Sequence, residues 1–303
     1  TTGARNVSMG QASLATNTTG SNNIALGYSA LYTNSSGASN VAVGTNALSL
    51  STVSDNTAVG FSALEVNTTG RINTAVGKNS MIANTTGGDN SAFGGLTLDA
   101  NTTGNSNTAL GYASLSANTT ANNNTAVGSL ALHSNTTASE STAVGYQSLY
   151  NSNAADNTAI GTQSQKNTTS GSNNTSVGAG SSYGNTTGSY NTSLGRSALQ
   201  NNTTASNNTA VGYQAGYSNT TGTQNTAIGR ASLLRNTTAN LNTAVGDYSL
   251  FGNTTGAKNV ALGAAALESN TTASNNTAVG YKAGFSNTTG DGNAAFGYQA
   301  FLD

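Results

Sequence analysis

The sequence predicts an all-β protein, a parallel β-solenoid in which each seventeen-residue repeat forms one coil. Three observations predict this fold class: a strict period, the residue types within each repeat, and the scarcity of good helix formers. Asn, Thr, Ser and Gly dominate the repeats, and all four residue types form helices poorly. We therefore expect repeated short strands and turns.

A glycine recurs at a nearly constant spacing, and we use it as the reference glycine of each repeat. Successive reference glycines are seventeen positions apart, except for two steps of sixteen, Gly44 to Gly60 and Gly145 to Gly161. A register this strict is typical of a solenoid and not of disordered low-complexity sequence. The eighteen reference glycines are Gly10, Gly27, Gly44, Gly60, Gly77, Gly94, Gly111, Gly128, Gly145, Gly161, Gly178, Gly195, Gly212, Gly229, Gly246, Gly263, Gly280 and Gly297.

The residue types around the reference glycine indicate where the strand and the turns lie. The residue directly before it is always apolar, and the residue two before it is Ala or Ser. Asn lies four before it in all repeats but one, and NTT or NSS begins seven after it in most repeats. Thr, Val and Ile favour extended backbone, whereas Asn and Gly favour turns. Equivalent strands that pair in parallel would stack identical residues ~4.8 Å apart.

A single repeat is too small to fold alone. Ordering its backbone costs roughly 1–2 kcal/mol per residue, and burying one large aliphatic side chain contributes at best ~1.5–3 kcal/mol. Stability must therefore come from stacking against neighbouring coils. We expect residues 1–303 to form one continuous solenoid, and because the repeats run to both ends, we expect it to be a segment of a longer protein.

The composition excludes several classes of partner. Charged residues make up 6% of the chain and the net charge is −1, so no basic field is available to attract nucleic acid or anionic lipid. The chain has no Cys, which rules out a disulfide framework and a thiolate metal site. No apolar run approaches the roughly 18 residues of a membrane span.

The Asn four residues before the reference glycine is predicted to be structural. Stacked Asn side chains form ladders in parallel sheets, where each amide donates to the next. We expect such a ladder at the equivalent positions Asn23, Asn56, Asn107, Asn208 and Asn276.

The NTT and NSS words also match the N-glycosylation pattern. Acceptors ~4.8 Å apart are too close for every site to carry a branched sugar, so glycosylation would be sparse at most. We favour a turn-forming role for these words. The representative acceptors are Asn17, Asn67, Asn101, Asn219 and Asn287.

Residue types that carry chemistry are few and scattered. His133 is the only histidine, and the ten acidic residues do not recur at a fixed position of the repeat. Solenoids that bind calcium place an Asp in each turn, and that pattern is absent from the sequence. We therefore expect a protein that is not an enzyme and that has no catalytic, metal or cofactor site.

Aromatic residues near the reference glycine are the remaining candidates for a binding surface. If these side chains point outward, they could stack on the sugar rings of a cell-surface glycan. Alternatively, they cover the edge of the coil or fill an interface between chains, which we favour. The Tyr residues directly after the reference glycine are Tyr28, Tyr112, Tyr146, Tyr213, Tyr281 and Tyr298.

The strand offers two uncharged faces, one of bulky apolar residues and one of small residues. One face can fill the narrow interior of the coil. The Ala two residues before the reference glycine would let a second backbone approach closely, so we expect the alanine face to be an interface between chains. This pattern favours a homotrimer over a monomer.

The words NTAVGYQAGYS, NTALGYASLSA and NTAVGFSALEV resemble the head repeats of YadA-type trimeric adhesins, and the NTTG punctuation is similar to repeats of bacteriophage tail fibres. The resemblance covers the chain from Asn6 to Phe301. It implies a left-handed parallel β-roll, three chains side by side, and a role as an adhesive head or rigid spacer. The departures from the family are a longer period and the lack of a stretch that we expect to form a coiled-coil stalk or a membrane anchor.

Two functions follow as hypotheses. The first is an extracellular fibre, filament or adhesin segment on a cell or virion surface, a rigid spacer that also offers a binding surface for a glycan or receptor. The alternative is an ice-binding solenoid, because Thr recurs at three positions per repeat. Uncapped solenoid ends also allow an end-to-end filament.

Overall fold

The computed structural model describes residues 2–302, which contain eighteen short β-strands and no helix. Each strand spans three residues and ends directly before a reference glycine. The chain divides into two compact units, Thr1–Ala155 and Asp156–Asp303, each of which is a stack of coils. The prediction that the two units form one continuous solenoid stays a prediction.

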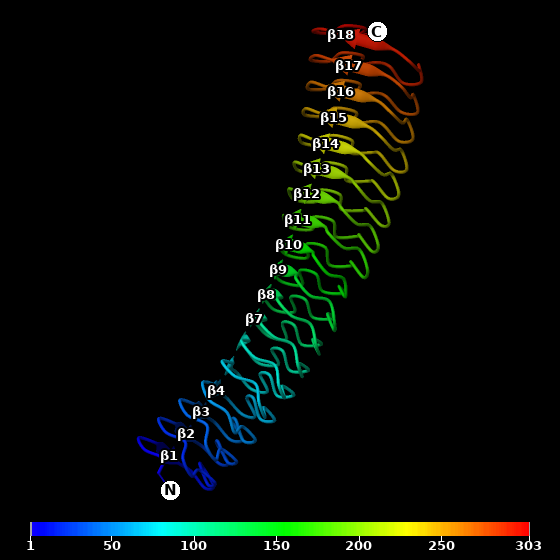
Figure 1. Cartoon of the computed structure of the whole chain (residues 1–303). Helices are drawn as coiled ribbons and strands as arrows, with labels where there is room; N and C mark the ends of the chain where they lie inside the picture. Colours follow the sequence, from blue (N-terminus) through cyan, green and yellow to red (C-terminus); the bar gives the residue numbers. More distant parts are fainter. Residues whose placement is uncertain (1, 303) are drawn as a thin grey trace. The chain divides into compact units, whose positions relative to one another are not determined.

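Unit 1 holds nine strands that stack in parallel in chain order (Figure 1). Paired residues are seventeen positions apart, as in Val7 and Ile24, but sixteen apart between β3 and β4, where Val41 pairs with Thr57. The strands are β1 (Val7–Met9), β2 (Ile24–Leu26), β3 (Val41–Val43), β4 (Thr57–Val59), β5 (Thr74–Val76), β6 (Ser91–Phe93), β7 (Thr108–Leu110), β8 (Thr125–Val127) and β9 (Thr142–Val144).

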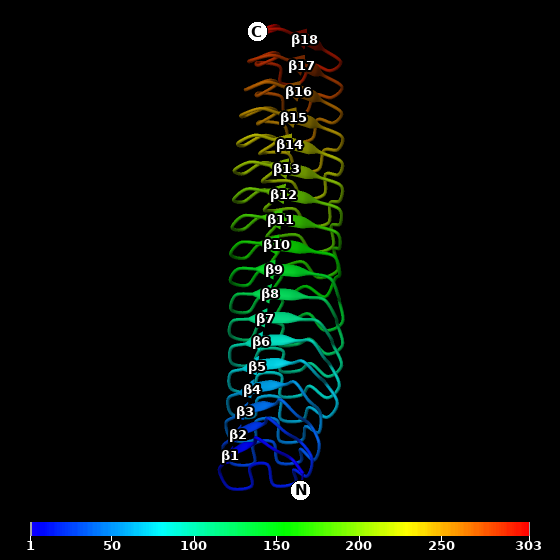
Figure 2. The ribbon, with the colours of Figure 1, turned by 60° about the vertical axis from the view of Figure 1, so that its left-hand side comes forward.

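Unit 2 repeats this arrangement with nine further strands, which Figure 2 shows one above another. The pairs within this unit keep the seventeen-residue register, as in Thr158 with Thr175. The strands are β10 (Thr158–Ile160), β11 (Thr175–Val177), β12 (Thr192–Leu194), β13 (Thr209–Val211), β14 (Thr226–Ile228), β15 (Thr243–Val245), β16 (Val260–Leu262), β17 (Thr277–Val279) and β18 (Ala294–Phe296). The predicted fold class, a parallel β-solenoid with one repeat per coil, is therefore confirmed.

The interior of each unit is built from columns of equivalent residues. Alanines in the middle of the strands, such as Ala58 and Ala210, are fully buried. They face a leucine column four residues after the reference glycine, which includes Leu64 and Leu250. In most coils two Asn residues complete the interior, so much of the core is polar and depends on hydrogen bonds.

The structure corrects the prediction that the alanine face is an interface between chains. The alanines lie inside the coil, and the bulky residue directly before the reference glycine points outward. The physical reason is space, because a coil that already holds a Leu and two Asn side chains leaves room at mid-strand only for a side chain as small as Ala or Ser. Since both strand faces are uncharged, the sequence did not reveal which face is internal.

The reference glycine is required by conformation and by space. Gly212 has a φ of +135°, which L side chains rarely adopt. A Cβ atom there would lie 2.5 Å from the carbonyl oxygen of Gly229 in the next coil. The same close approach recurs from coil to coil, which explains why no other residue stands at this position.

The leucine column has an unusual backbone. Leu64 and Leu250 have φ angles of +50° and +49°, in the left-handed region that costs a non-glycine residue roughly 1–2 kcal/mol. The N–H of Leu250 donates to the carbonyl of Ala266 (2.9 Å), and the side chain is fully buried. Stacking on the neighbouring coils therefore holds a conformation that one repeat would not keep.

Candidate interaction surface

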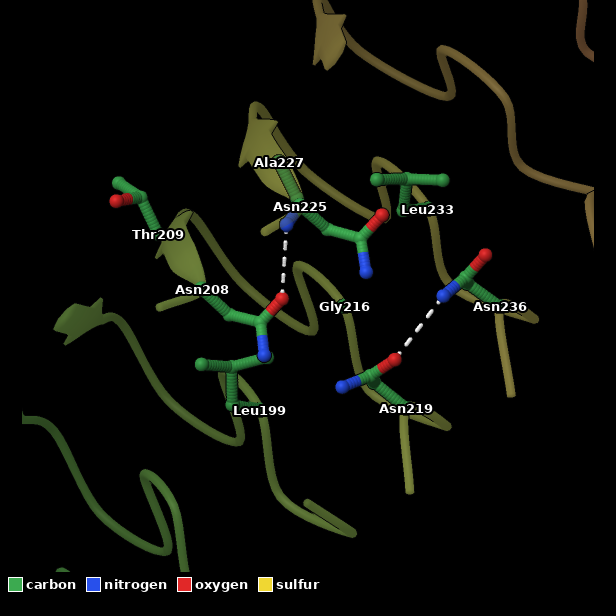
Figure 3. A pocket seen from close by; sticks show the side chains of 9 residues that line it. All are labelled: Leu199, Asn208, Thr209, Gly216, Asn219, Asn225, Ala227, Leu233 and Asn236. Carbon is green, nitrogen blue, oxygen red and sulfur yellow. Dashed lines mark hydrogen bonds between the residues drawn. The ribbon is translucent and has the colours of Figure 1, made fainter. Parts of the chain in front are cut away.

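The Asn residues predicted as a structural ladder lie inside the coils. All five predicted residues are buried: Asn23, Asn56, Asn107, Asn208 and Asn276. In the coil shown in Figure 3, the Asn208 side-chain oxygen accepts a hydrogen bond from the backbone N–H of Asn225 (2.9 Å), while Asn208 Nδ2 donates to the Gly222 carbonyl (2.9 Å). These residues thus serve mainly as caps for the backbone of the next coil, whereas we expected them to bond amide to amide. Asn107 does both, because its Nδ2 also donates to Asn90 Oδ1 (3.1 Å).

The amide-to-amide ladder is instead built by the Asn of the NTT words, which we call the sequon ladder. Asn219 Nδ2 donates to Asn202 Oδ1 (3.0 Å), and Asn236 Nδ2 donates to Asn219 Oδ1 (3.0 Å), a bond drawn in Figure 3. In unit 1 the same pattern joins the coils from Asn67 to Asn135, where for example Asn101 donates to Asn84 (2.8 Å). Sequence reasoning assigned these residues to turns alone, although the regular Asn at one fixed position was a signal for a second ladder.

The sequon ladder bears on the hypothesis of sparse glycosylation, which stays a prediction. Asn67, Asn101 and Asn219 are buried, and the amide nitrogen that would carry a sugar points into the coil. Asn17 and Asn287, in the outermost coils, are half-buried. Their Nδ2 atoms donate to the Gly20 carbonyl (3.0 Å) and to Asn270 Oδ1 (3.0 Å). The folded coil therefore does not present these nitrogens to a glycosylating enzyme.

The outward strand face carries two columns of side chains in each unit. The outer column is the bulky residue directly before the reference glycine, and the threonine column lies two residues earlier on the same side of the strand. Neither column contains a charged residue. Several outer-column side chains keep a large exposed fraction: Met9 70%, Phe93 42%, Leu110 47%, Ile160 40%, Leu194 47%, Ile228 38%, Leu262 38% and Phe296 66%. The outer column therefore forms a long apolar stripe in each unit, with the threonine column beside it.

The aromatic residues directly after the reference glycine are exposed, on the turn that follows the bend at the glycine. All six tyrosines predicted as surface residues are among the exposed large side chains, as is Phe61 at the equivalent position. Tyr281 and Tyr298 stack on each other with their ring centroids 5.5 Å apart. Lys282 Nζ lies 5.6 Å from the Tyr281 ring centroid. The structure brings this pair together and leaves the other rings apart.

Few titratable groups interact. Asp99 is half-buried and its Oδ1 has no hydrogen-bond partner, so burial raises the pKa of this carboxyl. His133 stacks on Tyr150 with ring centroids 5.0 Å apart. Arg230 makes a two-pronged ion pair with Asp247 (2.9 and 2.8 Å), and this hydrogen bonding lowers the pKa of Asp247. Within residues 2–302, no three His, Asp or Glu side chains are grouped as a metal ion would require.

A small internal cavity of about 10 Å³ lies where Gly216 replaces a member of the leucine column (Figure 3). Leu199 and Leu233 lie in the coils on either side, and both Asn ladders pass beside it. The cavity is no larger than one water molecule needs. It is a local packing defect and not a ligand site.

Comparison with known proteins finds no protein-family model that matches the chain and no similar curated protein. In the part of the chain from residue 2 to residue 302, no helix is long and apolar enough to cross a membrane.

Proposed function

We propose that the chain is a structural segment of an extracellular fibre or adhesin on a cell or virion surface, in which three copies assemble side by side. The repeated coils make a rigid spacer, and their outer surfaces serve as binding surfaces. The observation that supports this proposal is the apolar stripe on the outward strand face of each unit. A spacer needs length and regularity, and the chain devotes nearly all of its residues to both.

The stripe suits a second copy of the same chain. Its columns repeat once per coil. The apolar side chains of two copies placed side by side therefore have the same spacing and can contact each other along a whole unit. Association costs an estimated 4–15 kcal/mol before any gain appears. Each Å² of apolar surface removed from water contributes about 25 cal/mol to the free energy of association. Because the stripe buries such surface in every coil, the summed contribution can offset that cost.

The molar mass in solution, measured by light scattering over a dilution series, tests the assembly. We expect a mass close to three times the 29.9 kDa of one chain. A mass of one chain at all concentrations contradicts the proposal. A mass that grows without limit as the concentration rises indicates the end-to-end filament instead.

A pair of variants locates the interface. Leu110→Glu and Leu194→Glu place charges on the outer columns, whereas Ser106→Glu is the matched control on the exposed turn. Glu140 occupies the position equivalent to Ser106 in another coil, so the fold accepts a Glu there. We expect the outer-column variants to dissociate the trimer and the control to leave it intact. Equal behaviour of all three would exclude the stripe as the interface.

Ice binding remains a second candidate function because the threonine column and the outer column together form a regular, uncharged array on stacked strands. Thr209 and Thr226, for example, occupy paired positions of neighbouring strands and are partly exposed. The array is interrupted where Val260 and Ala294 replace Thr. Thermal hysteresis in solutions of the purified protein would support this function, and its absence would remove it. The assembly and the ice surface would use the same face.

A further inference from the structure

Unit 1 carries a row of exposed aromatic rings that the spacer role does not explain. The row consists of the residues directly after four reference glycines: Tyr28, Phe61, Tyr112 and Tyr146. Their exposed fractions are nearly equal, at 53%, 51%, 57% and 48%. About half of the surface of each of these residues is therefore in contact with solvent. Aromatic rings held in this way offer flat apolar faces for stacking.

The backbone under the row is fixed. The carbonyls of Tyr28 and Phe61 accept hydrogen bonds from the N–H groups of Asn46 and Asn79 in the next coils (both 2.9 Å). The Tyr112 carbonyl accepts from the N–H of Leu130 (2.9 Å). A row mounted on a stack of this kind is pre-organised, so little conformational entropy is lost when a ligand binds.

The spacing of the rings follows the coils. Two coils separate Tyr28 from Phe61 and Tyr112 from Tyr146, and three coils separate Phe61 from Tyr112. At ~4.8 Å per coil, these steps are ~9.6 Å and ~14.4 Å. One coil thus advances by nearly the length that one pyranose adds to an extended β-1,4-linked polysaccharide, and two coils match its disaccharide.

The surroundings of the row are polar and nearly uncharged. Thr45, Gly95 and Ser129 occupy the equivalent positions in coils between the rings, and Lys78 is the only charged residue of the row. Asn46 and Asn79 follow Thr45 and Lys78 in the chain, and the side-chain amide of Asn46 can donate and accept hydrogen bonds, whereas Asn79 Oδ1 is buried. A surface of this kind suits a neutral ligand with many hydroxyl groups.

Unit 2 lacks an equivalent row. Tyr281 and Tyr298 lie in adjacent coils and stack on each other, so each covers part of its partner's face. The positions between Tyr213 and Tyr281 hold Arg230, Asp247 and Ala264, and the first two form an ion pair. A row of rings separated by two or three coils, free of ion pairs at the positions between them, is therefore a property of unit 1.

We infer that the aromatic row of unit 1 binds a neutral, extended β-1,4-linked polysaccharide such as cellulose or chitin. The sugar chain lies along the stack with about one pyranose per coil, and the four rings stack on four of its residues. This inference rests on the proposal that the chain presents a binding surface, but it does not depend on the trimer.

Binding of the full chain to insoluble cellulose and chitin, and to their soluble hexasaccharides by calorimetry, tests the inference. The double variant Tyr28→Ala/Phe61→Ala removes two rings of one disaccharide step. We expect its apparent affinity to fall by about tenfold or more, a loss of roughly 1.4 kcal/mol or more. Tyr32→Ala is the matched control, since Tyr32 is an exposed ring of the same coil as Tyr28 but lies outside the row.

The comparison ligand is amylose, whose α-1,4 links coil the chain and break the match with the stack. Preference for the β-linked polymers together with loss in the double variant alone supports the inference. No binding by the wild-type protein, equal binding of amylose, or an equal loss in Tyr32→Ala overturns it. Light scattering on the same samples shows separately whether the trimer is present, so failure of the assembly is distinguished from failure of the glycan site.

Discussion

Two stretches of unit 2 differ in the side chains that occupy the leucine column, the position four residues after the reference glycine. From Leu199 onward, alanines and leucines form one apolar cluster, with Leu233, Leu250 and Leu267 in the leucine column. In the two coils that begin the unit, Gln165 and Ser182 occupy that column. We call the first stretch the leucine core and the second the serine core.

The serine core replaces apolar contacts with buried hydroxyl bonds. Ser181 Oγ donates to Ser193 Oγ (2.7 Å), and Ser193 Oγ donates to Ser176 Oγ (2.8 Å). Ser182 Oγ also lies 2.8 Å from Ser193 Oγ. Strand register and backbone bonds are the same in both stretches. The difference teaches that the backbone ladder and the reference glycines define the coil, whereas the column filling decides how much each coil contributes to stability.

Truncating one column residue in each core gives the largest contrast. Leu250→Ala in the leucine core removes a fully buried side chain and should lower the free energy of unfolding by about 2–5 kcal/mol. Ser182→Ala at the equivalent position should cost about 1 kcal/mol or less, because Ser193 keeps its bonds to Ser176 and Ser181. Chemical denaturation monitored by circular dichroism measures both. Equal losses would show that the two cores contribute alike.

Breaking the sequon ladder should have the next largest effect. Asn219→Ala removes the bonds to Asn202, Gly222 and Asn236, so we expect a loss of roughly 1–3 kcal/mol. In the serine core, Thr168 takes the place of the ladder Asn, and Asn185 Nδ2 lies 3.5 Å from its Oγ1. Thr168→Val should therefore cost less than about 1 kcal/mol. Hydrogen exchange of the neighbouring amides is the readout, and a larger effect of Thr168→Val would refute the comparison.

Converting the serine core toward the leucine core should stabilise it modestly. The Gln165 side chain is fully buried, and its Oε1 has no hydrogen-bond partner. Gln165→Leu removes this unsatisfied acceptor and restores the apolar column, which should outweigh the loss of the bonds that Gln165 Nε2 donates to the carbonyls of Thr158 (2.9 Å) and Asn174 (3.4 Å). The φ of +48° is already that of the leucines. We expect a gain of about 1 kcal/mol in the free energy of unfolding. Gln224→Leu on an exposed turn is the control, with an effect within about 0.5 kcal/mol. Loss of stability in Gln165→Leu would mean that the polar filling is needed.

The smallest effect concerns Asp99, a half-buried carboxyl whose Oδ1, unlike the serine hydroxyls, has no hydrogen-bond partner. Burial raises the pKa of Asp99 above its ordinary value of 3.8. A raised pKa means that the favourable contribution of the protonated carboxyl is complete below the ordinary value and is lost as the pH rises through the folded value. Asp99→Asn should therefore be slightly more stable than the wild type at pH 7, with the advantage vanishing in acid. Thermal unfolding between pH 3 and pH 7 measures this, with Glu65→Gln at the same coil position as the control. An advantage that grew in acid would contradict it.

The sequence predicted the coil but not its inside. The reference glycine set the period, and the observed parallel pairing keeps that register residue by residue, as in Val211 with Ile228. The sequence did not show which face of the strand points into the coil, because the adjacent residues Ala210 and Val211 are both uncharged. Only the volume of Leu250, its neighbours and the two Asn ladders decides that the alanine lies inside.

The candidate surface was predictable in part. The exposed tyrosines were identified by their place after the reference glycine, and their exposure follows from the bend there. The ladder formed by the sequon Asn residues was not predicted, because the same NTT letters describe a glycan acceptor, a turn and an internal ladder. Distinguishing them requires knowing on which side of the turn Asn67 or Asn219 points, which depends on the coil above it.

The glycine-to-glycine contact between neighbouring coils has a consequence for how such a gene changes over generations. Every coil of a unit offers the next one the same backbone groups at the same places, as Gly212 does with Gly229. Recombination between two repeats in the DNA that adds or removes the codons of one whole repeat therefore leaves each remaining junction chemically complete. A chain with one coil more or one coil fewer within a unit is therefore expected to fold through the same contacts.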